Sequence, residues 1–218
     1  GETAVRDFLA YLRELVAERR RSPGNPERDV LTRLIQGEKT GEQLSEIELL
    51  QNCIFILNAG HETTTNLIGN GLYNLLEWPE EKARLLAEPE LIDRAVEEFL
   101  RFDSPVQLGN RLTTAPVTIG GVDMPAGTFV TLGLAAANRD PAAFPDPDRL
   151  DLGRVQNRHV AFASGVHVCV GLAIARMEGR VAILRFLQRF PNYRLAGKPV
   201  RGNRARFRGF LTIPIEVG

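Results

Sequence analysis

Apolar residues recur every three or four positions over several long stretches of the chain, which is the spacing typical of amphipathic helices. The helices predicted in this way cover residues 3–20, 29–36, 46–77, 80–87, 89–102 and 171–190. The longest of them begins at a capping box formed by Ser45 and Glu48 and ends before Trp78 and Pro79. A polar loop through Gly41 precedes this helix.

The remainder of the chain has the patterns of strands and irregular loops. No repeat and no change in composition marks a second domain. The pattern therefore predicts one domain that is mainly α with small antiparallel β-sheets. The segments predicted after the helix at 89–102 are a β region at 110–135 with strands at 111–119 and 128–134, a proline-rich meander at 140–155, a cysteine loop with its helix at 160–190, and a terminal hairpin at 192–217 whose strands fall within 206–217.

The charges balance, since Lys and Arg number 27 and Asp and Glu number 27 among the 218 residues. Without a net charge, the chain shows no electrostatic sign of binding nucleic acid or an anionic membrane. The longest purely apolar run, Cys53–Leu57, is far too short to span a bilayer. Two distant cysteines and the lack of a signal-peptide pattern at Gly1 favour a cytoplasmic protein without a disulfide framework.

The middle of the long predicted helix carries residues that form helices poorly. Gly60, Glu62 and Thr63 lie there, within the run Ala59–Asn66. If this region is buried, the carboxylate and the hydroxyl must be satisfied or must serve a purpose, because an unpaired buried polar group is costly. A threonine hydroxyl can also bond to the carbonyl four residues earlier and bend the helix. The alternative is a solvated polar patch on a surface helix.

Cys169 lies in a glycine-bearing loop directly before the helix predicted at 171–190. Backbone N–H groups and the positive end of a helix favour the thiolate form of such a cysteine. A buried thiolate is the ligand with which a haem iron can cleave an O–O bond. Two alternatives stay open, namely an inert buried cysteine and a nucleophile with His159 or His167 as its base. A zinc site is disfavoured, because the only other cysteine, Cys53, is far away in the sequence.

Four segments, in chain order, resemble motifs of the cytochrome P450 family. The oxygen-activation motif of that family, Ala/Gly-Gly-x-Asp/Glu-Thr-Thr/Ser, is matched by residues 59–64 without a gap. The cysteine-ligand loop of the family is Phe-Gly-x-Gly-x-His-x-Cys-x-Gly, and Ala163 stands where its first glycine is usual. The matching residues in this loop are Phe162, Gly165, His167, Cys169 and Gly171.

Two shorter segments complete the resemblance. Glu98 and Arg101 match the Glu-x-x-Arg pair, which in the family closes a buried network with an arginine of the meander, Arg149 in this sequence. Taken alone, such a pair is usually a weak surface interaction. Arg111 stands where the family has an arginine that binds the haem propionates together with the histidine two residues before the cysteine, His167 here. The plain alternative for Arg111 is a solvated charge at the edge of a strand.

The resemblance implies the C-terminal portion of the cytochrome P450 fold, with haem b held through the thiolate of Cys169. It implies that Gly60 lets haem and dioxygen approach the backbone, that Thr63 hydrogen-bonds the dioxygen, and that Glu62 helps to relay protons. The residues that it further assigns to haem binding are Ala59, Arg111, Phe162, Gly165 and His167, and those that it assigns to substrate contact are Val106, Gln107, Leu108 and Leu211.

The reaction implied by the resemblance inserts one oxygen atom of dioxygen into an apolar small molecule. Electrons would come from a ferredoxin or a flavodoxin, because no segment resembles a flavin domain, and Arg176 and Arg180 are candidates for the docking face. The matched motifs are those of the second half of a P450. Two alternatives therefore stay open: a haem-binding fragment without turnover, and a haem-free helical domain that acts in binding or interaction.

Overall fold

The computed structural model describes residues 2–37 and 44–218, so the loop predicted around Gly41 lies outside the described residues. The chain divides into two compact units, one up to His61 and one from Glu62 to Gly218. The sequence predicted no internal boundary, and the structure has one inside helix α3 (Glu46–Glu77). Because a continuous helix crosses this boundary, no linker composition marks it in the sequence.

The first unit consists of helices α1 (Glu2–Arg21) and α2 (Val30–Gln36) and the beginning of α3. Its core joins Leu12 and Val16 of α1 to Leu49 and Leu50 of α3. The predicted capping box at the start of α3 is confirmed. Its Ser45 N–H donates to Oε2 of Glu48 over 2.8 Å, and the Glu48 N–H donates to the Ser45 hydroxyl over 3.3 Å.

Helix α3 is regular over all its 32 residues, so its polar middle neither widens nor breaks it. Hydrogen bonds along the helix outweigh the poor propensities of its glycine and threonines, as tertiary context commonly does. Within the described ranges, no helix combines the length and the apolar character needed to cross a bilayer.

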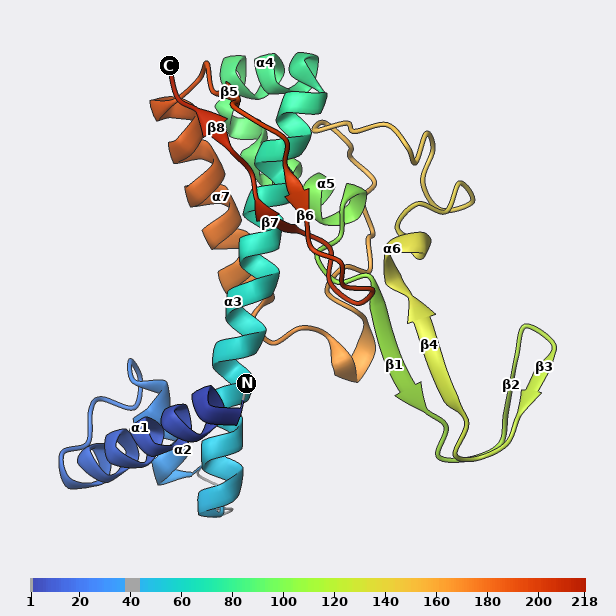
Figure 1. Ribbon diagram of the computed structural model, residues 1–218. Helices are drawn as coiled ribbons and strands as arrows, with labels where there is room; N and C mark the ends of the chain where they lie inside the picture. The colour runs from blue at the N-terminus through green and yellow to red at the C-terminus, as the bar shows by residue number, and fades with distance from the viewer. Residues whose placement is uncertain (1, 38–43) are drawn as a thin grey trace. The chain divides into compact units, whose positions relative to one another are not determined.

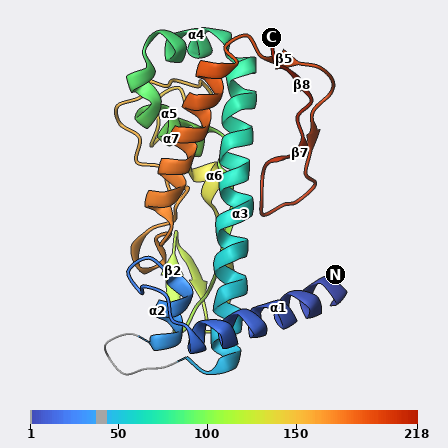
Figure 2. The ribbon, with the colours of Figure 1, turned by 90° about the vertical axis from the view of Figure 1, so that its left-hand side faces the viewer.

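The second unit packs the part of α3 from Glu62 onward against three further helices, which are α4 (Pro79–Ala87), α5 (Ile92–Phe102) and α7 (Leu172–Arg189). The helix predicted at 89–102 is a 3₁₀ turn, Pro89–Leu91, followed by α5. Helices α3 and α7 lie side by side (Figures 1 and 2). Their closeness depends on Gly179, where a Cβ would lie 3.1 Å from the side chain of Leu67.

The β region is two small antiparallel sheets rather than two long strands. Strand β1 (Leu108–Leu112) pairs with β4 (Phe129–Gly133), and β2 (Val117–Ile119) pairs with β3 (Val122–Met124). The strand predicted at 111–119 is therefore wrong in its bounds, because Pro116 lacks an N–H and interrupts the alternating stretch. A short helix, α6 (Leu134–Ala137), follows β4 and was too short to give a periodic signal.

The C-terminal segment folds back on itself as one interrupted hairpin (Figure 1). Strand β5 (Arg194–Leu195) pairs with β8 (Ile215–Glu216), and β6 (Val200–Arg201) pairs with β7 (Phe210–Thr212). The prediction that 206–217 forms a hairpin by itself is wrong, because its two strands pair with the 194–201 arm and not with each other. The alternating pattern locates strands but does not identify their partners.

Candidate functional site

A buried ion pair joins helix α5 to the rest of the site. The two carboxylate oxygens of Glu98 accept hydrogen bonds from Nε and Nη2 of Arg101, each over 2.8 Å. Both side chains are completely buried. The predicted pairing of Glu98 with Arg101 is therefore present, and it is far from the weak surface interaction that an acid and a base at this spacing usually form.

The prediction that Arg149 supplies the third side chain of this network is wrong. The Arg149 side chain is exposed, and only its carbonyl takes part, accepting from Nη2 of Arg101 over 3.1 Å. The arginine that reaches Glu98 is Arg154, whose Nε lies 3.1 Å from Oε2. Both arginines lie in the meander, and the sequence gives no sign of which one the turns direct inward.

Every remaining hydrogen-bonding group of the pair is used. Glu98 also accepts from the side-chain amide of Asn157 over 3.1 Å and from the Asp151 N–H over 3.0 Å. Nη1 of Arg101 donates to the carbonyls of Asn138 over 3.0 Å and Pro147 over 2.8 Å. Since a buried charge is tolerated only with such partners, the pair fixes the meander against α5.

Asn138 connects the buried ion pair to the cysteine loop. Its side-chain oxygen accepts from the Val160 N–H over 2.7 Å, and its side-chain nitrogen donates to the Ser104 hydroxyl over 2.8 Å. Asn138 is completely buried and its carbonyl already accepts from Arg101. Sequence reasoning missed Asn138, Arg154 and Asn157. The only available signal concerned Asn138, which is a polar residue directly after a run of alanines.

The cysteine loop is shaped by its backbone. The Cys169 N–H donates to the Phe162 carbonyl over 2.9 Å, and the Val168 N–H donates to the Gly165 carbonyl over 3.0 Å. Two residues have positive φ, Gly165 at 64° and Ala163 at 59°. Glycine adopts this left-handed region freely, whereas alanine is strained there. The residue at which the sequence departs from the family motif is thus one whose backbone conformation favours glycine.

The thiol of Cys169 is free and exposed, which corrects the expectation of a buried sulfur. The loop turns its backbone toward Phe162 and leaves the side chain on the outside. Val166, Val168 and Val170 flank the thiol and are 96%, 49% and 99% exposed. Adjacent exposed apolar residues in a folded protein indicate a surface that another group covers. A thiol among apolar side chains fits an iron porphyrin, whose ring is apolar and whose iron accepts a thiolate.

Two of the predicted haem-binding residues offer cationic or hydrogen-bonding groups. Arg111 is half-buried in β1, and its Nη1 donates to the neighbouring Asn110 carbonyl over 2.8 Å. Within the described residues it forms no ion pair. His167 is exposed at the end of the short 3₁₀ turn Gly165–His167. Both side chains are therefore able to pair with a carboxylate of a bound group.

The predicted catalytic residues, together with the predicted haem-binding residue Ala59, lie on both sides of the unit boundary. Ala59 and Gly60 are exposed and belong to the first unit, while Glu62 and Thr63 are half-buried and belong to the second, with Cys169. A Cβ added at Gly60 would meet nothing within 4 Å. Glu62 pairs with Arg204, whose Nη1 lies 2.5 Å from Oε1. The carboxylate is thus held by the C-terminal hairpin.

The residues predicted to contact substrate precede and begin β1. Val106 forms an isolated antiparallel bridge with Phe207. The Gln107 N–H donates to the Arg206 carbonyl over 2.9 Å, and its side-chain amide donates to the Ser104 carbonyl over 2.6 Å. Leu108 is half-buried. The fourth residue, Leu211 in β7, is 68% exposed.

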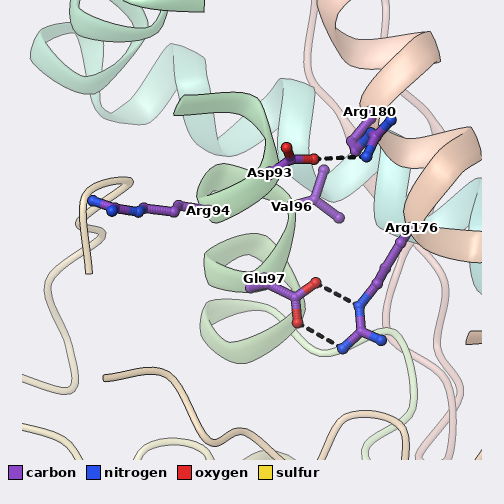
Figure 3. Close-up of a pocket in the computed structure, with 6 residues that line it drawn as sticks. All are labelled: Asp93, Arg94, Val96, Glu97, Arg176 and Arg180. Carbon is purple, nitrogen blue, oxygen red and sulfur yellow. Dashed lines mark hydrogen bonds and ion pairs between the residues drawn. The ribbon is translucent and has the colours of Figure 1, made fainter. Parts of the chain in front are cut away.

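A pocket of about 310 Å³ lies between α5 and α7, at the face expected to dock an electron donor, and Figure 3 shows the residues that line it. Arg176 contacts Glu97 through two hydrogen bonds of 2.6 and 2.8 Å, and Arg180 lies 2.9 Å from Asp93. The two arginines are therefore paired rather than free. Arg94, the fifth charged residue of the lining, leaves one positive charge in excess.

Glu97 is the most perturbed group of this pocket. Burial by itself would raise its pKa, but hydrogen bonds from His159 and Arg176 outweigh burial and lower the pKa from 4.5 to about 2. Nδ1 of His159 accepts the Ala161 N–H over 3.2 Å, so Nε2 carries the proton that is shared with Glu97 over 3.0 Å. Glu97 thus stays ionised at neutral pH and connects α7 to the start of the cysteine loop.

The comparisons with known proteins agree on one family. The family model for cytochrome P450 matches residues 2–203. Cytochrome P450 107B1 of Saccharopolyspora erythraea is 45% identical over 97% of this chain and 52% of its own length, and the vitamin D(3) 25-hydroxylase of Pseudonocardia autotrophica is 45% identical over 99% and 54%. The chain thus spans about half the length of the curated relatives it matches.

A solved structure of the family is similar to the whole fold. The complex of P450BioI with an acyl carrier protein ligated to hexadec-9Z-enoic acid superposes with a TM-score of 0.91 at 39% identity. The match covers 97% of this chain and 54% of that one.

Replacing Arg154 should test the corrected network. Arg154→Gln leaves Glu98 with one positive partner fewer in a buried environment, and we expect the free energy of unfolding to fall by about 3 kcal/mol. Arg149→Gln is the matched control, because that side chain is exposed and its carbonyl is retained. Denaturant unfolding of the native protein that contains this chain measures both. Equal losses in the two variants would contradict the assignment of Arg154.

Replacing Ala163 should relieve strain in the cysteine loop. Ala163→Gly removes the Cβ from a residue with φ of 59°, and we expect the free energy of unfolding to rise by about 1 kcal/mol. Ala173→Gly, on the exposed face of α7, should lower it by about 1 kcal/mol. The same unfolding measurement checks both, and a loss of stability in Ala163→Gly would show that the loop is not strained there.

Proposed function

Because this chain belongs to the cytochrome P450 family, we propose that the native protein containing it is a haem-thiolate monooxygenase that acts on an apolar small molecule. The observation that carries the proposal is the exposed Cys169 thiol among apolar side chains, on a loop connected by hydrogen bonds to the buried Glu98–Arg101 pair. Such a loop holds a single sulfur at one place, as an iron ligand requires. We propose the class of substrate and the electron donor together with this activity.

Haem b would be held by this chain through three kinds of contact. Cys169 would ligate the iron as a thiolate, and Arg111 and His167 would pair with the propionates. Phe162 and Gly165 would shape the loop that carries the sulfur, while Ala59 and Gly60 would allow close approach to the helix backbone. When bound, haem supplies the redox chemistry that cleaves dioxygen.

The protein's own contribution to that chemistry would be the ordered supply of protons. The Thr63 hydroxyl would donate a hydrogen bond to the dioxygen, and Glu62 would bring protons from solvent. Glu62 is suited to this task because its side chain is 35% exposed, so it can exchange protons with water. Its pairing with Arg204 keeps the carboxylate in one place between proton transfers.

The proposed partners of the native protein are a substrate and an electron donor. The substrate would be apolar and would contact Val106, Gln107, Leu108 and Leu211. The C16 acyl chain bound in the similar P450BioI complex supports an apolar substrate. A ferredoxin or flavodoxin would supply electrons at the face formed by α5 and α7. Since Arg176 and Arg180 are paired with acids, that donor would be recognised by shape and by one excess positive charge. The cytoplasmic location stays a prediction.

A second candidate is a haem-binding or haem-free protein without turnover, acting in binding or interaction. In such a protein water would reach the haem, and reactive species would not be protected. Purified protein that is colourless, or that binds haem but forms no product with an electron donor, would support this candidate.

Removing the cysteine should abolish thiolate ligation. In the native protein, Cys169→Ala should lose the absorption band that is typical of the reduced, carbon monoxide-bound haem-thiolate state, because no other sulfur lies in the loop. Cys53→Ala removes the other free cysteine, which lies in the first unit, and should keep the band. A Cys169→Ala protein with an unchanged band would contradict the ligand assignment.

Removing the hydroxyl of Thr63 should uncouple electron use from product formation. Thr63→Ala should still bind haem and consume reducing equivalents, but more electrons should appear as hydrogen peroxide, because protons arrive without order. Glu62→Gln should instead slow turnover by about 100-fold, since the relay is interrupted. Thr65→Ala, at an exposed position of the same helix, is the control. If the native and Thr63→Ala proteins direct the same share of electrons into product, this part of α3 is only a polar stretch of helix.

A further inference from the structure

The C-terminal hairpin carries four arginines within eight residues, at positions 201, 204, 206 and 208. Such a cluster often binds an anionic partner. Here, however, Arg201 and Arg208 contact Asp103, and Arg204 contacts Glu62. Only Arg206 forms no ion pair within the described part of the chain. The cluster therefore acts inward, on the carboxylates of the same unit, and not as a docking surface.

Asp103 is the centre of these contacts. Its side chain is only 6% exposed and directly follows helix α5. Oδ2 accepts from Nη1 and Nη2 of Arg201, each over 3.2 Å, and Oδ1 accepts from Nε of Arg208 over 2.5 Å. The guanidinium of Arg201 also lies 3.8 Å from the ring centroid of Phe210. One buried carboxylate thus holds two positions on opposite arms of the hairpin.

Asn70 of α3 completes the anchor. Its side-chain nitrogen donates to the carbonyls of Asp103 over 3.1 Å and Arg208 over 2.9 Å, and its oxygen accepts from Arg201 over 3.3 Å. Directly after Arg208, a Cβ at Gly209 would overlap the amide of Asn66 in α3. Charge pairing and close backbone approach therefore fix residues 206–209 against α3 and the end of α5.

The anchored segment is the one that contacts the candidate substrate residues. The Gln107 N–H donates to the Arg206 carbonyl and the Arg208 N–H donates to the Pro105 carbonyl, both over 2.9 Å. Val106 and Phe207 lie opposite each other between these bonds. The bridge is a single residue pair, and among the described residues no ladder of paired strands joins these two segments to set their register. The contacts of Asp103 with Arg201 and Arg208 supply that constraint from outside the bridge.

We infer that Asp103 is a positioning residue, which sets the register of residues 105–107 against 206–208 and thereby places Val106 and Leu108 in the wall of the substrate pocket. The assignment of these residues to a substrate wall rests on the proposed function. The register itself does not depend on haem.

Two variants and one matched control test the inference in the native protein. Asp103→Asn keeps the shape of the side chain but removes its charge, and Arg208→Gln removes one donor. Hydrogen exchange followed by mass spectrometry should show the amides of residues 106–108 and 206–208 exchanging at least about tenfold faster, with α7 unchanged. Arg206→Gln alters the same charge two residues away and should leave these amides at the native rate.

A spectroscopic readout separates positioning from stability. Imidazole and 4-phenylimidazole both bind haem iron through nitrogen, but only the second extends into the pocket. The ratio of their dissociation constants should change severalfold in Asp103→Asn and Arg208→Gln and stay native in Arg206→Gln. Arg208→Lys, which keeps the charge, should recover part of the change.

The inference fails if exchange at residues 106–108 stays native, or if it rises equally in α7, since Asp103 would then serve only general stability. It also fails if exchange rises locally while the ratio stays native, because the segment would then not form the pocket wall. Failure of the proposed function is distinguishable: it would appear as a native protein without the haem-thiolate band, and the exchange comparison would still decide the register.

Discussion

The position of the cysteine loop depends on one buried ion pair, Glu98 with Arg101. Taking a carboxylate and a guanidinium out of water costs several kcal/mol for each ion, and their attraction offsets this only when the remaining groups are also hydrogen-bonded. The remaining partners all come from residues 138–157. The pair is therefore stable only when this irregular segment adopts one conformation, and the segment is ordered only when the pair is present.

This mutual dependence explains how a segment without regular structure can hold a precise site. Residues 138–164 form neither helix nor strand, so no backbone ladder orders them. Asn138 contacts both Arg101 and the Val160 N–H, and from Val160 the chain reaches Cys169 through the hydrogen bond to Phe162. The strain at Ala163 lies within this path. Backbone strain persists only where the surroundings enforce it, which agrees with a loop that Asn138 and the buried ion pair hold in place.

Much of this was predictable from sequence, and the exceptions have physical causes. The helix at 46–77 follows from its period, its capping box and the proline after it, all local signals. Which meander arginine reaches Glu98 is set by turns such as the one at Asp146, whose φ is 46°, and no spacing rule reports that. The strand partners in 192–217 likewise depend on packing between distant segments. The candidate residues themselves were predicted from motifs, which indicate the chemistry of a site more directly than its geometry.

The sheets show why ionic anchors matter so much in this fold. Among the described residues every sheet has only two strands, and a two-stranded sheet is marginally stable in water. Helix α5 compensates at its end: Glu98 and Arg101 hold the meander, and Asp103 holds the C-terminal hairpin. Two segments that flank the candidate site are thus fixed to one helix by charge rather than by sheet formation. Because such contacts are specific in direction and partner, they set positions that apolar packing alone would leave free to shift.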